Sequence, residues 1–366
     1  MNLLVPNLGS TSLKYQILEM PSEKVSARGR FERVRDFGEA IGQIAAGGIA
    51  VDAVVFKAVH AGPQYCGTFP IDDVVLRAME EFLPAAPAHN AIYLAAIRAF
   101  RDGLPGIPMV AAFETEFHDT IPAWARLYGV PAAWRAEGVR KYGFHGASHQ
   151  YVAERVAAIL GRHTRLVSCH LGGSSSICAI DRGRSIDTSM GFSPQSGLEN
   201  ATRHGDLDAF AVLFMMERHG WTCAQAREQL AKTGGLAGLS GIAGGDVRDL
   251  EQAAREGDAL AAEALRVFAY QVTKTIGAYA AALGGLDAVA FTGGIGENSA
   301  SLRAACCRGL EFLGIALDPE LNERSSGDRI VSNGPVAVMA VATNEELIVA
   351  RRAFRLLTGA CGTLAS

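Results

Sequence analysis

Residues 3–18 read LLVPNLGSTSLKYQIL, in which the apolar run Leu3 to Val5 breaks into a polar turn and resumes at Tyr15 to Leu18. Short apolar runs bounded by turn residues predict a strand, a tight turn and a returning strand. The pattern recurs at residues 165–180, which read RLVSCHLGGSSSICAI. Two similar hairpins, separated by about 160 residues, indicate a duplicated domain.

Strand and helix patterns alternate on both sides of these hairpins. After the second hairpin, a turn at 181–184 leads into residues 185–188, which favours a three-strand meander. Further strands are predicted at 53–56, 109–113, 288–291 and 336–341. Helices are predicted near 72–82, 90–101, 208–219, 223–232 and 246–283, the last interrupted near residues 256–257, and after 343–346. The fold class is therefore α/β with mixed sheets.

The length of the chain predicts two domains, because 366 residues exceed one small core and domains average about 150 residues. No low-complexity linker marks the boundary, which we place near residues 118–122. The helix at the C-terminal end is expected to pack back on the first domain.

Charge and composition exclude several classes of partner. Lys plus Arg number 34 against 38 Asp plus Glu, so no overall basic field attracts nucleic acid. No run approaches the roughly 18 apolar residues that span a bilayer, and no membrane association is expected. The first residues lack a secretory signal pattern, and the seven cysteines form no C-x-x-C spacing. We therefore expect a cytoplasmic protein with small-molecule partners.

Three glycine-containing turns predict a site for nucleotide phosphates. Turns of this kind can aim several N–H groups and hydroxyls at phosphate oxygens, although glycine and serine also occur in hairpin turns for local reasons. Because three such turns occur, ATP is the expected ligand. The P-loop pattern G-x-x-x-x-G-K-[ST] is absent, and the third turn lacks the spacing of a dinucleotide fingerprint. The turns are Asn7 to Lys14, Gly172 to Ser176 and Gly293 to Gly296.

Phosphoryl transfer also requires positive charge and carboxylates, because positioning and electrostatics carry the reaction. Candidate phosphate-binding side chains are Lys57, His145 and Arg203, and candidate carboxylates are Glu114 and Glu345. Each of these residues alone also fits a structural role; Glu345, for example, suits a helix N-terminus. His149 follows His145 by four residues, but without a Glu between them a zinc-hydrolase helix is not favoured.

Together these motifs resemble the acetate kinase family, within the superfamily of acetate kinases, sugar kinases, Hsc70 and actin. The resemblance runs along nearly all of the chain. The residues that carry it are 7–14, 140–146, 169–172, 188–192, 291–299 and 343–346.

The resemblance implies two RNase H-like (actin-like ATPase) domains around a central cleft. The first would comprise 1–118 plus 348–366, and the second, 119–347, would bind nucleotide and form most of a homodimer. The implied activity is that of a phosphotransferase with a carboxyl acceptor, which converts ATP and acetate to ADP and acetyl phosphate by in-line transfer. Mg²⁺ or Mn²⁺ would be the cofactor, with ATP or ADP and a short carboxylate as substrates.

Site roles also follow from the resemblance. The catalytic residues would be Lys57, Glu114, His145 and Arg203. The acid would contact Lys57, Val59, Ala88, Phe144 and Pro194. The metal would bind Asn7 and Glu345. The nucleotide would contact Asn7, Ser10, Ser12, Lys14, His170, Gly172, Gly173, Ser174, Asp246, Val247, Arg248, Gly293, Gly294, Ile295, Gly296 and Asn298.

The departures from the family pattern lie at these positions. Lys57 replaces a substrate-binding arginine, so a bidentate fork becomes a point charge. Glu114 replaces a family aspartate, Gly173 stands where the family has asparagine, and Ala88 stands where leucine would wall the acid pocket. Two alternatives therefore stay open: a kinase for propionate or a longer short-chain acid, and a catalytically impaired ATP-binding homologue of the actin or Hsc70 kind.

Overall fold

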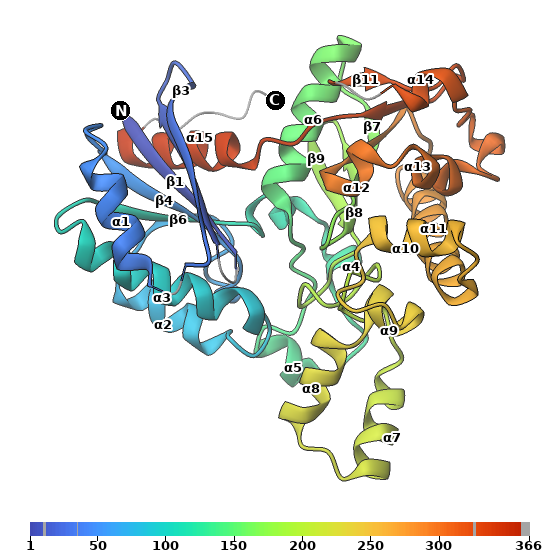
Figure 1. Cartoon of the computed structure of the whole chain (residues 1–366), viewed down its shortest axis with the longest axis horizontal. Helices are drawn as coiled ribbons and strands as arrows, with labels where there is room; N and C mark the ends of the chain where they lie inside the picture. Colours follow the sequence, from blue (N-terminus) through green and yellow to red (C-terminus); the bar gives the residue numbers. More distant parts are fainter. Residues whose placement is uncertain (10–11, 35, 325–326, 360–366) are drawn as a thin grey trace.

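The computed structural model describes residues 1–9, 12–34, 36–324 and 327–359 (Figure 1). Two six-stranded sheets lie side by side, and helices cover both faces of each. The first sheet consists of β1 (Asn2–Leu8), β2 (Ser12–Glu19), β3 (Lys24–Glu32), β4 (Ala53–Ala58), β5 (Thr68–Pro70) and β6 (Met109–Phe113). The second consists of β7 (Arg165–His170), β8 (Ser176–Asp181), β9 (Arg184–Thr188), β10 (Ala288–Thr292), β11 (Arg329–Ile330) and β12 (Ala337–Ala340).

The two sheets have the same topology. The first has the order β3-β2-β1-β4-β6-β5, and the second, read from the opposite edge, has the order β9-β8-β7-β10-β12-β11. In each, an antiparallel three-strand meander is followed by two parallel strands and an antiparallel edge strand. The predicted duplication and mixed sheets are confirmed.

The two hairpins pair as the sequence predicts. In the first, Leu3 pairs with Leu18 and Leu8 with Leu13, while in the second Cys169 pairs with Ile177. The strand β3 was not among the predicted strands. Its sequence KVSARGRFE contains few apolar residues, and none of its residues is buried, so it carries a weak strand signal.

Helices on opposite faces of the first sheet bury alternate residues of its strands, as the two-residue period of a strand requires. On one face, Leu4 and Phe56 pack with α1 (Phe37–Ala46), α2 (Asp73–Glu81) and α3 (Pro87–Gly103). On the other, Leu3 and Val55 pack against α15 (Glu345–Thr358). Figure 1 shows this last helix, in red, beside the blue strand β1.

The second sheet is covered in the same way. Val167 and Phe291 face α10 (Val247–Arg255), α11 (Ala259–Ala282) and α13 (Ala300–Cys307). Leu166 and Ala290 face α6 (Gly146–Leu160). The predicted interruption near residues 256–257 separates α10 from α11, and Asp258 caps the second helix by accepting from the N–H groups of Leu260 and Ala261.

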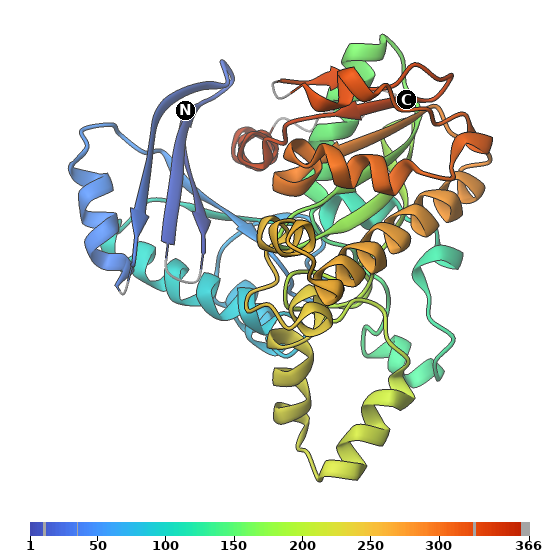
Figure 2. The same cartoon turned by 45° about the vertical axis from the view of Figure 1, so that its right-hand side comes forward.

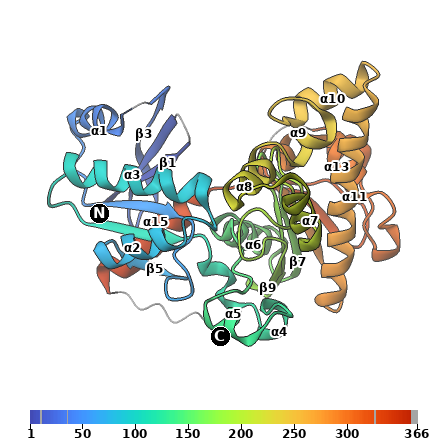
Figure 3. The same cartoon turned by 90° about the horizontal axis from the view of Figure 1, so that it is seen from below.

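The remaining helices are short or project from the two layers. Figures 1 and 2 show α7 (Ala209–His219) and α8 (Cys223–Lys232) extending from the second half, and Figure 3 views them from below. No residue of α7 is buried, although eight of its residues form the apolar run AFAVLFMM. Within the described ranges, no helix is long and apolar enough to cross a membrane. The others are α4 (Ala123–Arg126), α5 (Ala132–Ala136), α9 (Gly235–Ser240), α12 (Gly293–Asn298), α14 (Pro319–Glu323) and the 3₁₀ helices Glu116–Thr120 and Glu311–Leu313.

Candidate active site

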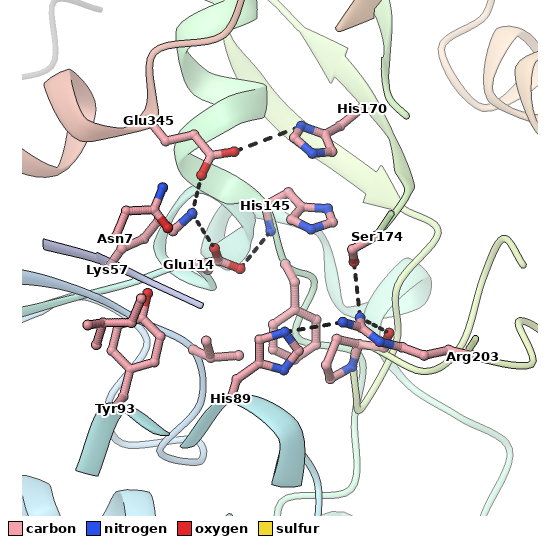
Figure 4. A pocket seen from close by; sticks show the side chains of 14 residues that line it. Asn7, Lys57, His89, Tyr93, Glu114, His145, His170, Ser174, Arg203 and Glu345 are labelled. Atoms are coloured by element: carbon pink, nitrogen blue, oxygen red, sulfur yellow. Dashed lines mark hydrogen bonds and ion pairs between the residues drawn. The ribbon is translucent and has the colours of Figure 1, made fainter. Parts of the chain in front are cut away.

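A pocket of about 220 Å³ lies between the two halves, where several strands end (Figure 4). Asn7, Lys57 and His170 stand near the ends of β1, β4 and β7, and Glu114 directly follows β6. Glu345 opens α15 after β12. In open α/β sheets, ligands bind outside the carboxyl ends of the strands. The location of these side chains therefore follows from the topology.

A second pocket of about 650 Å³ adjoins the first and shares Asn7, His170, Ser174 and Glu345 with it. Because these four residues line both, the two pockets are the ends of one cleft. The rest of the second pocket combines glycines with polar side chains. These residues are Lys14, Gly172, Gly173, Gly293, Gly294, Glu297, Thr343 and Glu346.

Lys57 lies between two carboxylates. Its ammonium contacts Glu345 Oε2 and stands 3.6 Å from Glu114 Oε1. Burial alone would lower the pKa of Lys57, but the two glutamates outweigh burial and raise this pKa well above its ordinary value. Burial, together with Glu345, raises the pKa of Glu114, whereas Lys57 and His170 overcome burial and lower the pKa of Glu345. The positive charge of Lys57 is therefore already balanced.

Arg203 is placed differently. Its Nη1 donates to Ser174 Oγ at 3.0 Å and to the Pro194 carbonyl at 3.1 Å, and its Nη2 donates to His89 Nε2 at 3.2 Å. Burial, with Arg203 and Lys57, lowers the pKa of His89 to about 3, so His89 is a neutral acceptor. In the part of the chain that the structure describes, Arg203 pairs with no carboxylate. Its charge is available to an anion in the cleft.

Two histidines lie between these cations. The rings of His145 and His170 stack with centroids 4.3 Å apart and planes inclined by 24°. Burial, followed by the neighbouring His170 and His149, lowers the pKa of His145 well below its usual value. Burial also lowers the pKa of His170. Both rings are therefore neutral at physiological pH.

Among the described residues, apolar side chains line only the first pocket and not the second. Val59 and Phe144 are buried there beside Leu8, Pro194 and Tyr93. Burial raises the pKa of Tyr93 to about 12, so its hydroxyl remains protonated. Ala88 belongs to α3, but its side chain lies outside the described parts of the structure, as do Ser10 and Thr11.

Glycine is required at one position of the second pocket and leaves space at another. Gly293 has φ +77°, and a Cβ there would stand 2.7 Å from the Leu171 carbonyl oxygen. At Gly294, a Cβ would meet nothing within 4 Å. The open space over Gly294 faces the turn Gly172–Ser176, in which Ser175 Oγ accepts from Gly172 N at 3.1 Å. A phosphate can approach bare backbone here.

Some predicted nucleotide contacts do not line either pocket, and their role stays a prediction. Asp246 caps α10 and pairs with the exposed Arg248, while Val247 belongs to the core. Asn298 donates to the Gly294 carbonyl at 2.9 Å and so supports the turn. The other predicted residues outside both pockets are Ser12, Ile295 and Gly296.

Sequence reasoning missed several lining residues. His89 stands in the stretch that contains Ala88, and Thr343 and Glu346 belong to the motif that contains Glu345, so these motifs held a usable signal. Leu8 and Glu297 likewise lie within the motifs 7–14 and 291–299. Nothing in the local sequence distinguishes Tyr93 from an ordinary core position.

Comparison with known proteins agrees with this geometry. The sequence profile of the Acetokinase family matches residues 42–351. The chain is 42% identical to the acetate kinase of Geobacillus sp. (strain WCH70), over 97% of this chain and 98% of that protein. The crystal structure of Porphyromonas gingivalis acetate kinase has a TM-score of 0.86 at 35% identity, covering 97% of this chain and 99% of that one. The crystal structure of a propionate kinase from Francisella tularensis subsp. tularensis SCHU S4 has a TM-score of 0.88 at 30% identity, covering 96% of this chain and 98% of that one.

Proposed function

The chain belongs to the acetate kinase family of carboxyl-accepting phosphotransferases, and on this premise we propose that it transfers the γ-phosphoryl group of ATP directly to acetate. The products are ADP and acetyl phosphate. One observation supports this most: a small, partly apolar pocket opens into a larger, glycine-lined one, and His170 and Ser174 line both. The two ends suit a short acid and a chain of phosphates.

The acid end suits a short carboxylate. Val59, Phe144 and Pro194 offer apolar contact to a methyl group, and Arg203, which forms no ion pair among the described residues, attracts a carboxylate. Lys57, balanced by its two glutamates, adds less to this attraction. We therefore assign the binding of the anion mainly to Arg203 and the positioning of Glu114 and Glu345 to Lys57.

The larger pocket, where we place the phosphates, offers hydrogen-bond donors and little side-chain volume. Backbone at Gly172, Gly173 and Gly294 lines it, and His170 stands where the two ends meet. In phosphoryl transfer, charge spreads over the equatorial oxygens of the transferred group. We propose that His145 and His170 donate hydrogen bonds to these oxygens while Arg203 neutralises their charge. Preorganised donors of this kind typically contribute about a hundredfold in rate.

The residues at the junction fit Mg²⁺ or Mn²⁺. Asn7 donates through Nδ2 to Glu346 Oε1 at 2.9 Å, which leaves its amide oxygen as a ligand atom beside the Glu345 carboxylate. Mg²⁺ prefers such oxygen ligands with substrate phosphates and water. Among the described residues, no three His, Cys, Asp or Glu side chains could hold a metal by themselves. When bound, the ion supplies charge that neutralises the phosphates.

We also propose a homodimer formed mainly by the second half, and domain bounds of 1–118 plus 348–366 and 119–347. The exposed apolar face of α7 supports the dimer, because Phe210 and Phe214 are 77% and 57% exposed in the single chain. Apolar patches of this kind mark association sites. Analytical ultracentrifugation should find twice the mass of 38.6 kDa, and a Phe214→Glu variant should shift the protein towards monomer.

The proposed reaction is tested by measuring ADP formation by the purified chain with Mg-ATP and a series of acids. Acetate should support the fastest turnover, with propionate slower and no ADP formed without acid. Faster turnover with propionate would make propionate, not acetate, the preferred acid, while the proposed phosphoryl transfer would stand. The absence of acid-dependent ADP formation, with nucleotide binding intact by calorimetry, would instead favour an impaired ATP-binding homologue.

A further inference from the structure

His149 is a buried histidine that lines neither pocket, yet it is connected to His145 through one hydroxyl. Its Nε2 lies 2.8 Å from Ser176 Oγ, which lies 2.9 Å from His145 Nδ1. On its other side, His149 Nδ1 lies 2.9 Å from Ser168 Oγ. Two serines and two histidines thus form one continuous series of hydrogen bonds that ends at the cleft.

The direction of these hydrogen bonds follows from the buried end of the series. Among the described residues, Ser168 Oγ has no hydrogen-bond partner other than His149, so its buried hydroxyl proton finds an acceptor only at His149 Nδ1. A neutral imidazole carries one N–H, so His145 can donate from Nε2 into the cleft only if its Nδ1 accepts. Ser176 has a single hydroxyl proton, and giving it to His145 makes its oxygen an acceptor for the N–H at His149 Nε2. His149 Nδ1 must then accept from Ser168. Burial lowers the pKa of His149 well below its usual value, which keeps this ring neutral.

We propose that His149 is a positioning residue: through Ser176 it holds His145 in the tautomer that carries its proton on Nε2, toward the cleft. The catalytic consequence rests on the proposed function, because only a transferred phosphoryl group makes use of that proton. The tautomer itself is a property of this chain's hydrogen bonds.

The backbone of His145 is held by other groups, so the serine link acts on the ring. His145 has φ +57°, an uncommon value for a residue other than glycine. Its N–H donates to Glu114 Oε2 at 3.2 Å, and the preceding carbonyl, of Phe144, lies 2.9 Å from His118 Nε2. Removing the Ser176 hydroxyl would therefore leave the turn fixed and free the ring proton to occupy either nitrogen.

His170 has a similar arrangement of hydroxyl groups beside its Nδ1. Thr343 Oγ1 donates to Ser148 Oγ at 2.9 Å, and Ser148 Oγ lies 2.8 Å from His170 Nδ1. Since Thr343 uses its proton on Ser148, the Ser148 proton is free to go to His170 Nδ1. Glu345 Oε1 also lies 3.9 Å from this nitrogen and favours a proton on it (Figure 4), so the two neighbours of His170 Nδ1 oppose each other, and the tautomer proposed here is that of His145 alone.

Kinetics of matched variants test the positioning role. Ser176→Ala should lower kcat about threefold to tenfold, the scale of one hydrogen bond, with the KM for ATP and acetate within about twofold. Ser332→Ala is the control, because it removes a buried serine hydroxyl that bonds only to backbone, at Val336 O and Val338 N. His149→Gln retains a donor and an acceptor and should keep more activity than His149→Leu. Equal kcat values for Ser176→Ala, Ser332→Ala and wild type would overturn the positioning role.

The tautomer is measured directly by long-range ¹H–¹⁵N correlation in protein labelled with ¹⁵N-histidine, which identifies the protonated nitrogen without reference to activity. His145 should carry its proton on Nε2 in wild type and Ser332→Ala, and on both nitrogens in exchange in Ser176→Ala. A proton on Nδ1 in the wild type would overturn the proposal. An inactive wild type with the expected tautomer would instead refute the proposed function and leave the hydrogen-bond assignment standing.

Discussion

Equivalent strands in the two halves of the molecule end in residues of different chemical character. In the first half, Lys57 stands near the end of β4 and Glu114 directly after β6. In the second, β10 leads into Gly293 and Gly294. The first strands also differ, since β1 ends near Asn7 and the equivalent β7 ends in His170. At the equivalent strands β4 and β10, one topology thus carries a long charged side chain on one side of the cleft and bare backbone on the other.

This difference explains the unequal sizes of the two pockets. Side chains from both halves, among them Lys57 and Arg203, fill much of the smaller pocket and leave about 220 Å³, whereas four glycines of the second half line the larger pocket of about 650 Å³. A duplicated scaffold can therefore hold two unlike substrates end to end, with the reacting groups meeting between the halves. We expect a variant at a residue that lines only one pocket to change the kinetic constants for one substrate and not for the other.

The largest expected effect is at Arg203, the cation without a carboxylate partner. Arg203→Ala should lower turnover by at least about a hundredfold, because it removes charge that is prearranged for the transferred group. The affinity for nucleotide should change little, as judged by calorimetry. Arg98→Ala, which removes an exposed arginine paired with Glu80, is the control. Near-normal turnover of Arg203→Ala would remove Arg203 from the mechanism.

The next effect is on stability. Lys57→Met leaves the buried Glu114 and Glu345 facing each other, and breaking a buried ion pair in this way costs about 3 kcal/mol. Lys141→Met, which separates Lys141 from the single carboxylate of Asp187, should cost less. Urea unfolding near neutral pH measures both values.

The stability of Lys57→Met should also depend on pH differently from that of the wild type. In the wild type, the lowered pKa of Glu345 contributes stability above the ordinary carboxyl pKa, and this contribution is lost as pH falls. Without Lys57, the pKa values of both glutamates should lie above the unfolded value, so Lys57→Met should gain stability as pH falls from 7 toward about 5. The difference between wild type and variant should therefore narrow on acidification. A constant difference would show that the lysine does not hold these carboxylates ionised.

A smaller effect is expected on the nucleotide side. Gly294→Val should raise the KM for ATP about tenfold, because its side chain enters open space in the phosphate pocket without a clash in the fold. The KM for acetate should stay near the wild-type value. Gly42→Val, at another glycine with no atom within 4 Å of an added Cβ, controls for the substitution itself. Equal KM values for ATP in both variants would place the phosphates elsewhere.

The smallest effect is expected on the acid side. Val59→Ala enlarges the apolar wall and should raise the ratio of kcat/KM for propionate over acetate about fivefold, the value of roughly one buried methylene. The KM for ATP should not change. An unaltered ratio would mean that Val59 does not face the acid.

The sequence predicts the fold well because both hairpins combine buried apolar runs with polar turns. It also predicts the strand-end residues Lys57 and Glu114, since parallel strands bring their carboxyl ends to one edge of a sheet, and the family resemblance adds His170. The partners of these residues could not be predicted. That Lys57 lies between two glutamates, and that His149 reaches His145 through Ser176, depends on the separation of segments distant in sequence, which no local pattern specifies.

A crystal structure of the protein with Mg-ADP and acetate tests the division of the cleft most directly. We predict the β-phosphate beside Gly172, Gly173 and Gly294, and the acetate methyl group against Val59 and Phe144 with its carboxylate toward Arg203. Acetate bound outside the smaller pocket, or ADP phosphates placed among Lys57 and Glu114, would contradict the assignment of the acid to the smaller pocket and of the phosphates to the larger one.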